Sequence, residues 1–165
     1  MNNLTLVIPA KYEASTLPIV LKELEKFNVK KVIIIPKYDN ETLEAVKNFH
    51  CEIVHQKGEG FGSALIEGIA TVKTEFLCIF NADGSFDPKY LEEMIKLLEN
   101  GNDFIFNTRY EKNGGSDDDT FLTYVGNKIF TYLCKILFKL NISDVLFTYV
   151  MGKTDAFNHL ELKNK

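Results

Sequence analysis

The sequence has little or none of several features that mark particular classes of protein. It contains no tryptophan, and only three cysteines and four prolines in 165 residues. The cysteines, at positions 51, 78 and 134, are scattered, which favours reduced thiols in a cytosolic protein over disulfides or a zinc site. No run reaches the roughly 18 apolar residues of a membrane-spanning helix. Residues 5–9 resemble a short strand more than the apolar core of a signal peptide.

The net charge and the length of the chain limit which kinds of protein this can be and how many domains it has. The net charge of -4 argues against a nucleic-acid partner, because such a partner usually requires a basic face. Hydrophobic residues make up 45% and charged residues 25% of the chain, which is the composition of a globular protein. A chain of 165 residues is long enough for one domain with a full core. We therefore expect one domain over residues 1–165.

Short apolar runs alternate with segments of helical periodicity through the first two thirds of the chain. Strands are predicted at residues 4–8, 32–35, 53–55, 76–80 and 104–106. Helices are predicted at residues 17–27, 42–49, 62–72 and 88–98, the last with Asp87 as its N-cap. This alternation predicts an α/β fold with a mainly parallel sheet and helices on both faces.

The last third of the chain differs in character. Residues 111–120 are polar, acidic and glycine-rich, which is typical of a mobile loop. A long apolar helix is predicted at residues 122–140, interrupted only by lysines. Such a helix is either buried, as we expect, or lies against a membrane surface or a second copy of the chain. Residues 147–151 could form a late strand, and a polar tail follows.

A cluster of oxygen-bearing side chains follows the predicted strand at residues 76–80. Asn81, Asp83 and Ser85 alternate there, where open α/β sheets place their ligands. Mg²⁺ prefers oxygen ligands and usually takes one or two carboxylates plus substrate phosphates. The cluster therefore indicates a metal–diphosphate site, although a plain turn uses the same residue types.

Other strand ends carry further candidate residues. Tyr12 could stack on a flat base, and Glu13 could accept a hydrogen bond from a ribose or base. Asp39 is either a nucleoside ligand or simply a helix N-cap. The glycine-rich loop around Gly60 allows close backbone approach, but it matches neither the Walker A pattern nor the Gly-x-Gly-x-x-Gly spacing. Arg109 could clamp a phosphate or form a surface ion pair.

In order and spacing these features resemble the family 2 glycosyltransferases, which have the GT-A fold, over almost the whole chain. The matching segments are Val7–Glu13 at the opening strand, Gly60–Ala64 with Gly68 at the glycine-rich helix start, Asn81–Pro88 at the Asp-x-Asp metal motif and Thr108-Arg109 at a short Ser-Arg element. Asn127, Asp144 with Phe147, and Asp155–Phe157 are similar to the polyprenyl-phosphate branch, which includes relatives of dolichol-phosphate mannose synthase.

The resemblance implies transfer of a sugar from a nucleoside diphosphate sugar to an acceptor, with a polyprenyl phosphate as the acceptor of that branch. Mg²⁺ or Mn²⁺ would bridge the diphosphate, held by Asp83, Asn81 and Ser85. The residues implied at the nucleotide sugar are Pro9, Ala10, Tyr12, Glu13, Asp39, Gly60, Asn81, Ala82 and Asp83. Those implied in catalysis are Asp83, Arg109 and Asp144. The expected setting is the cytoplasm, at the inner face of the membrane, in synthesis of cell-envelope glycans.

The sequence also departs from the family pattern. Asn81 replaces the first aspartate of the metal motif, which should weaken metal binding, and Asp39 is the only acid in the turn after the second strand. The chain also ends soon after the Asp144 region, where family members usually continue, as a truncated chain would. A catalytically weak or inactive homologue that binds a nucleotide or a partner is therefore an alternative. A nucleotidyltransferase is a third, although residues 10–15 lack the early glycine-rich loop of those enzymes.

Overall fold

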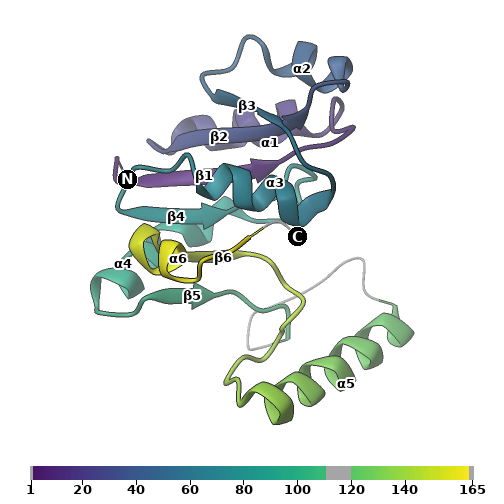
Figure 1. Cartoon of the computed structure of the whole chain (residues 1–165), viewed down its shortest axis with the longest axis vertical. Coiled ribbons are helices and arrows are strands. Elements are labelled where there is room, and N and C mark those ends of the chain that lie inside the picture. The colour runs from purple at the N-terminus through teal and green to yellow at the C-terminus, as the bar shows by residue number, and fades with distance from the viewer. Residues whose placement is uncertain (1, 111–119, 164–165) are drawn as a thin grey trace. The chain divides into compact units, whose positions relative to one another are not determined.

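The computed structural model describes residues 2–110 and 120–163 (Figure 1). The chain forms two compact units. The first comprises Met1–Ile105 and Met151–Lys165, and the second comprises Phe106–Val150. In sequence, the second unit is therefore an insertion into the first.

The larger unit is built around a six-stranded sheet. Its strands are β1 (Leu4–Pro9), β2 (Lys30–Pro36), β3 (Glu52–Gln56), β4 (Phe76–Ile79), β5 (Phe104–Phe106) and β6 (Val150–Lys153). Their order in the sheet is β3-β2-β1-β4-β6-β5. The β3–β2, β2–β1 and β1–β4 pairs are parallel, and β4 and β6 are antiparallel. The predicted α/β fold with a mainly parallel sheet is thereby confirmed.

Helices cover both faces of this sheet (Figure 1). They are α1 (Leu17–Glu23) with the 3₁₀ turn η1 (Leu24–Lys26), α2 (Asn40–Val46), α3 (Gly60–Ile69), the 3₁₀ turn η2 (Pro88–Tyr90) leading into α4 (Leu91–Glu99), and α6 (Thr154–His159). Gly68 brings α3 close to the sheet. A Cβ atom at this position would lie 2.5 Å from Val7 and 2.6 Å from Ile34, so only glycine permits this approach.

Most of the predicted elements occur with shifted ends, and one prediction at the C-terminus was wrong. The late strand predicted at residues 147–151 is β6, which begins at Val150 and ends at Lys153. The tail expected to be polar contains α6, whose Phe157 packs against Phe104 with ring centroids 4.9 Å apart. One buried aromatic contact thus fixes a helix that the polar composition of the tail obscures.

The smaller unit contains α5 (Phe121–Phe138). The Thr120 hydroxyl caps its first turn by accepting from the Thr123 N–H at 3.2 Å, and Lys139 ends it in the left-handed conformation. The burial that we expected for this helix is wrong, since most of its large apolar side chains are exposed. The acidic loop expected at residues 111–120 lies outside the described residues except for Thr120.

Candidate active site

The candidate site lies where β1, β2 and β4 end. These three strands are neighbours and parallel, so their carboxyl ends lie at one edge of the sheet. Backbone bonds from Ala10 N–H to the Ile34 carbonyl and from Phe80 N–H to the Val7 carbonyl, both 2.9 Å, extend the pairing to the start of the loops. The loops that carry Tyr12, Asp39 and Asp83 therefore leave adjacent strands.

Asp39 links the first two of these loops. One carboxylate oxygen accepts from the Tyr12 N–H at 2.6 Å, and the other accepts from the Thr42 N–H at 3.2 Å as the N-cap of α2. The residue is 2% exposed. Tyr12 has a φ of 62°, a left-handed conformation that costs a non-glycine residue about 1 kcal/mol. The N-cap interpretation of Asp39 is confirmed, and the bond to Tyr12 adds a role that sequence alone did not indicate.

The environment of Asp39 keeps its carboxylate ionised. Burial by itself would raise the pKa of Asp39, but hydrogen bonds from the Tyr12 N–H and from the hydroxyl and N–H of Thr42, together with the charge of Lys11, outweigh it. The pKa of Asp39 therefore lies below its ordinary value. A depressed pKa in the folded state stabilises the protein above the ordinary value, and this stabilisation is lost as the pH falls toward the folded-state value.

We expect Asp39→Asn to lower the free energy of unfolding at neutral pH by about 1.5–3 kcal/mol, because the hydrogen bonds to Asp39 lose their charged acceptor and one of them is broken. As the pH falls below about 4 toward the lower folded-state pKa of Asp39, the wild type progressively loses the same stabilisation, so the two proteins should converge. Urea unfolding at a series of pH values measures both effects. Glu41→Gln, at an exposed carboxylate in α2, is the matched control. A constant difference between wild type and D39N at all pH values would contradict this account.

An exposed aromatic pair flanks Asp39. Tyr12 and Tyr38 are 68% and 63% exposed, with ring centroids 6.3 Å apart, and the Lys11 ammonium lies 5.3 Å and 6.0 Å from the two centroids. Flat, exposed rings beside a cation are suited to stacking on a base near a phosphate. Glu13 is more constrained than expected, because its carboxylate accepts from the Thr16 hydroxyl and its N–H donates to the Thr42 hydroxyl at 3.0 Å.

The loop after β4 has an exposed stretch, Asp83–Ser85, between buried residues. Phe80 and Phe86 are buried and pack edge to face, with centroids 5.7 Å apart, which fixes both ends of the loop. Between them, the Asn81 side-chain amide donates to the Ser85 hydroxyl at 3.1 Å, and the Ser85 N–H donates to the Asp83 carboxylate at 2.9 Å. The three side chains of the predicted metal site therefore form one hydrogen-bonded cluster.

This cluster offers oxygen ligands but only one carboxylate. Within residues 2–110 and 120–163, no group of three or more His, Cys, Asp or Glu side chains is placed to hold a metal ion. Asp87, the next acid, accepts from the Lys89 N–H and pairs with the Lys89 ammonium. The residues present fit a divalent ion only if diphosphate oxygens complete its shell, as is common for Mg²⁺.

The glycine-rich loop before α3 is shaped by Glu67, a residue that we did not identify from the sequence. Its carboxylate accepts from the N–H groups of Lys57 and Gly58, both at 2.8 Å, and from the Ser63 hydroxyl at 3.0 Å. The Gly58 N–H is the main reason that the pKa of Glu67 lies below its ordinary value. The spacing of Ser63 and Glu67, one helical turn apart, was the available signal.

Arg109 and Asp144 form an ion pair within the smaller unit. The guanidinium donates to both carboxylate oxygens, from Nε at 2.8 Å and from Nη2 at 3.1 Å. The Asp144 side chain is fully buried and that of Arg109 is 18% exposed. Arg109 also lies over the Tyr110 and Phe147 rings, 5.0 Å and 5.3 Å from their centroids. The surface ion pair weighed for Arg109 is thus a largely buried, bidentate one.

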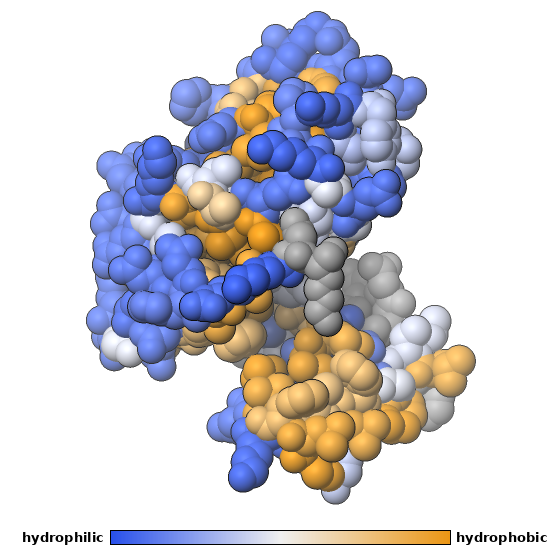
Figure 2. All heavy atoms as spheres, in the orientation of Figure 1, coloured by the Kyte–Doolittle hydropathy of each residue, from blue (hydrophilic) through white to orange (hydrophobic). Residues whose placement is uncertain are grey.

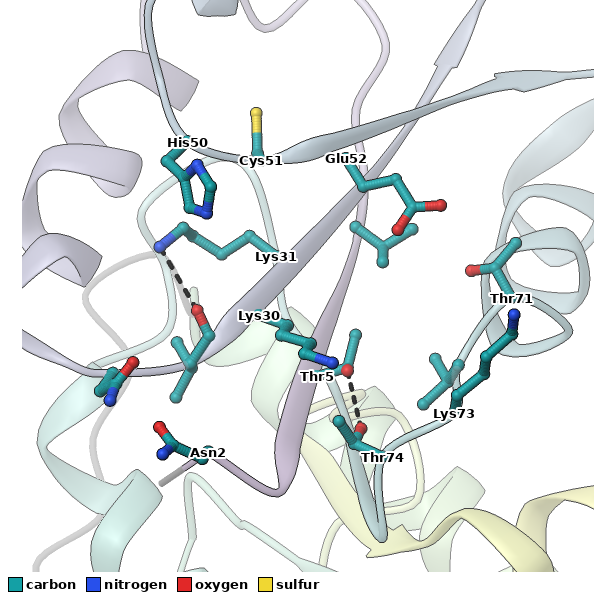
Figure 3. Close-up of a pocket in the computed structure, with 14 residues that line it drawn as sticks. Asn2, Thr5, Lys30, Lys31, His50, Cys51, Glu52, Thr71, Lys73 and Thr74 are labelled. Atoms are coloured by element: carbon teal, nitrogen blue, oxygen red, sulfur yellow. Dashed lines mark hydrogen bonds between the residues drawn. The ribbon is translucent and has the colours of Figure 1, made fainter.

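A cavity of about 830 Å³ lies at the opposite, amino-terminal end of the same strands (Figure 3). Its lining includes Thr5, Lys30, Lys31, His50 and Lys73, and the Thr5 and Thr74 hydroxyls are hydrogen-bonded at 2.7 Å. None of the site residues predicted from the sequence is among its lining residues. We place the candidate site at the carboxyl edge instead, because the oxygen cluster and the aromatic pair lie there.

Comparison with known proteins gives relatives with the same architecture. The chain is 25% identical over 105 residues to an uncharacterised glycosyltransferase of Mycobacterium tuberculosis, and the match covers 64% of this chain and 48% of that protein. An uncharacterised glycosyltransferase of Mycobacterium bovis matches to the same extent. The chain thus spans about half the length of these curated relatives.

Solved structures show the fold more completely. Mannosyl-3-phosphoglycerate synthase of Rubrobacter xylanophilus is similar with a TM-score of 0.72 and 14% identity, over 93% of this chain and 54% of that one. Glucosyl-3-phosphoglycerate synthase of Mycobacterium tuberculosis was crystallised with Mn²⁺, UDP and glucosyl-3-phosphoglycerate. It is similar with a TM-score of 0.71 and 13% identity, over 92% of this chain and 57% of that one. Residues 5–161 match the family described as "Glycosyl transferase family 2". The chain therefore belongs to glycosyl transferase family 2.

Proposed function

We propose that this protein transfers a sugar from a nucleoside diphosphate sugar to a phosphate-bearing acceptor. The observation that carries the proposal is the hydrogen-bonded cluster of Asn81, Asp83 and Ser85 at the end of β4. It follows a strand beside β1, whose loop presents Tyr12 with its N–H bound to Asp39. A diphosphate and a base could be held by these adjacent loops.

Each residue group has a role in this proposal. Tyr12, with Glu13, would contact the nucleoside, and Asp39 would act mainly by holding the Tyr12 loop in place. Pro9, Ala10, Gly60 and Ala82 would bring backbone close to the donor. Mg²⁺ or Mn²⁺, held by Asp83, Asn81, Ser85 and the diphosphate, would neutralise charge that develops on the leaving group. Asp83, Arg109 and Asp144 are the proposed catalytic residues, the last two on the acceptor side.

We propose a polyprenyl phosphate as the acceptor, because exposed apolar side chains cover α5 in the same unit as Arg109 and Asp144. A water-soluble acid is the alternative, since the structural neighbour from Mycobacterium tuberculosis was crystallised with glucosyl-3-phosphoglycerate.

A second function, nucleotide or partner binding without transfer, is favoured by one observation. The amide at Asn81 supplies a neutral ligand where a carboxylate would bind the ion more tightly.

Calorimetric titration with UDP, GDP and their sugar conjugates tests the proposal. Because the loop supplies one carboxylate, we expect Mn²⁺ alone to bind weakly and one nucleotide to bind at least about tenfold more tightly with Mn²⁺ than without it. Radiolabelled sugar transfer to polyprenyl phosphate and to phosphoglycerate then identifies the acceptor. Metal-dependent binding without transfer would favour the binding-only function. A folded sample that binds no nucleotide would refute the transfer proposal and favour a function in binding a partner.

A further inference from the structure

The helix α5 has polar side chains on the face toward its own unit and large apolar side chains on the exposed face, the reverse of a helix on the surface of a soluble protein. Toward its own unit it presents small polar groups: the Asn127 amide donates to the Tyr110 hydroxyl at 2.8 Å, and the buried Thr131 hydroxyl accepts from the Val145 N–H at 3.3 Å. Cys134 is the other buried residue on this side. The bonds of this inner face fix which side of the helix faces outward.

The outer face carries the large apolar side chains. The most exposed on this face are Leu122, Ile129, Tyr132, Ile136 and Leu137. Figure 2 shows apolar side chains gathered over α5. Soluble proteins rarely expose a continuous apolar surface of this kind unless it binds something. No helix among the described residues is long and apolar enough to cross a membrane, so a transmembrane position does not explain the pattern.

The charges on this segment indicate what covers it. Residues 120–143 contain three lysines and no aspartate, glutamate or arginine, although the whole chain has a net charge of -4. Lys128 and Lys135 are seven residues apart, so at about 100° per residue they lie on the same side of the helix. Lys139 follows at the helix end. A row of lysines beside an apolar face is the arrangement of helices that lie in the surface of anionic membranes.

We propose that α5 is a peripheral membrane-binding surface that inserts its apolar face among the lipids while the exposed Lys135 and Lys139 contact anionic headgroups. A second copy of the chain fits less well, because a symmetric contact would bring two sets of lysines together with no acidic residue in either segment. This inference deepens the proposed function, since a polyprenyl phosphate is itself a membrane lipid. Its test, however, does not depend on transfer.

Tryptophan reporters test where the helix lies. Because the chain contains no tryptophan, Ile136→Trp reports on α5 alone, and Ile19→Trp in α1 is a matched control at 62% exposure against 58% for Ile136. With vesicles of equal parts phosphatidylglycerol and phosphatidylcholine, the emission of the I136W protein should shift to the blue and be quenched by brominated lipid. The I19W protein should show neither change. Identical responses of the two reporters would overturn the proposal.

Co-sedimentation with the same vesicles, with phosphatidylcholine vesicles as comparison, tests the two parts of the surface. Ile136→Glu should weaken binding about tenfold or more, and Ile19→Glu should leave it unchanged. Lys135→Gln should weaken binding only to the anionic vesicles and reduce its salt dependence. Equal binding to both vesicle types, binding to neither, or a dimer that I136E dissociates would overturn the proposal. The same variants are also titrated with nucleotide. Unchanged nucleotide binding shows that a loss of vesicle binding does not come from damage to the donor site.

Discussion

Asp83→Asn should abolish most metal-dependent nucleotide binding and lower kcat/KM for sugar transfer by about 100-fold or more. Asp83 is the one carboxylate of the Asn81–Ser85 cluster, so its loss leaves only neutral ligands at the diphosphate. An asparagine oxygen can still accept from the Ser85 N–H, so the loop should keep its conformation. Calorimetry with nucleotide and Mn²⁺, followed by steady-state kinetics, measures the effect.

Two further variants of the same loop sharpen this test. Asn81→Asp adds a carboxylate, and we expect Mn²⁺ to bind several-fold more tightly in the presence of nucleotide, because ion affinity rises with ligand charge. Asp87→Asn removes a carboxylate that caps η2 and pairs with Lys89, and it should affect stability by about 1 kcal/mol without changing metal dependence. If D83N and D87N weakened nucleotide binding equally, a general charge effect would replace the metal site as the explanation.

Asp144→Asn should lower the free energy of unfolding of the smaller unit by about 2–4 kcal/mol, because it removes the buried carboxylate that accepts two hydrogen bonds from the Arg109 guanidinium. Arg109 keeps some solvent contact, so the loss should stay below that of a fully buried pair. Urea unfolding measures the total change. Hydrogen exchange at the Val145 N–H, which donates to Thr131, and at the Asn107 N–H, which donates to the Tyr149 carbonyl, locates it.

The double variant Arg109→Met with Asp144→Val separates structure from chemistry. If the pair is mainly structural, an apolar replacement of both partners should restore most of the stability lost in D144N, because no charge is left buried. If Arg109 and Asp144 act on the acceptor as proposed, the double variant should be stable and inactive. A D144N protein of unchanged stability that nevertheless fails to transfer sugar would show a purely chemical role for this carboxylate.

The sheet could be predicted well because its signals are local. A continuous apolar run such as Val32–Ile35 is typical of a strand that is buried on both faces, and its four residues are almost fully buried. Pro9 and Pro36 mark the ends of β1 and β2. The ends of the late strand, predicted at residues 147–151 and observed at Val150–Lys153, depend on long-range contacts. β6 contains Gly152, a poor strand former, where a Cβ atom would lie 2.6 Å from the Phe104 ring. No periodicity along the chain reveals that requirement.

The sequence predicted the strand that the Asn81–Ser85 loop follows, but not the hydrogen bonds that connect the candidate residues. The pattern Asn81, Asp83, Ser85 indicated a ligand site at the end of a strand, and the structure places these side chains in one hydrogen-bonded cluster. The bond between Asp39 and Tyr12 joins residues from two different loops, which no sequence spacing encodes. The burial of residues 122–140 was wrong because an apolar sequence does not say whether protein or lipid surrounds it.

The position of β6 in the sheet has a consequence for how the protein is made. β6 lies between β4 and β5, yet it is the last strand in sequence among residues 2–110 and 120–163. A growing polypeptide must therefore hold a gap inside the sheet until Val150–Lys153 leave the ribosome, roughly two to nine seconds after β5 at typical synthesis rates. During that interval one edge of β4 has no partner strand, and an unpaired edge is where another nascent chain can attach. Synthesis is thus a stage at which this fold is exposed to aggregation through the edge of β4.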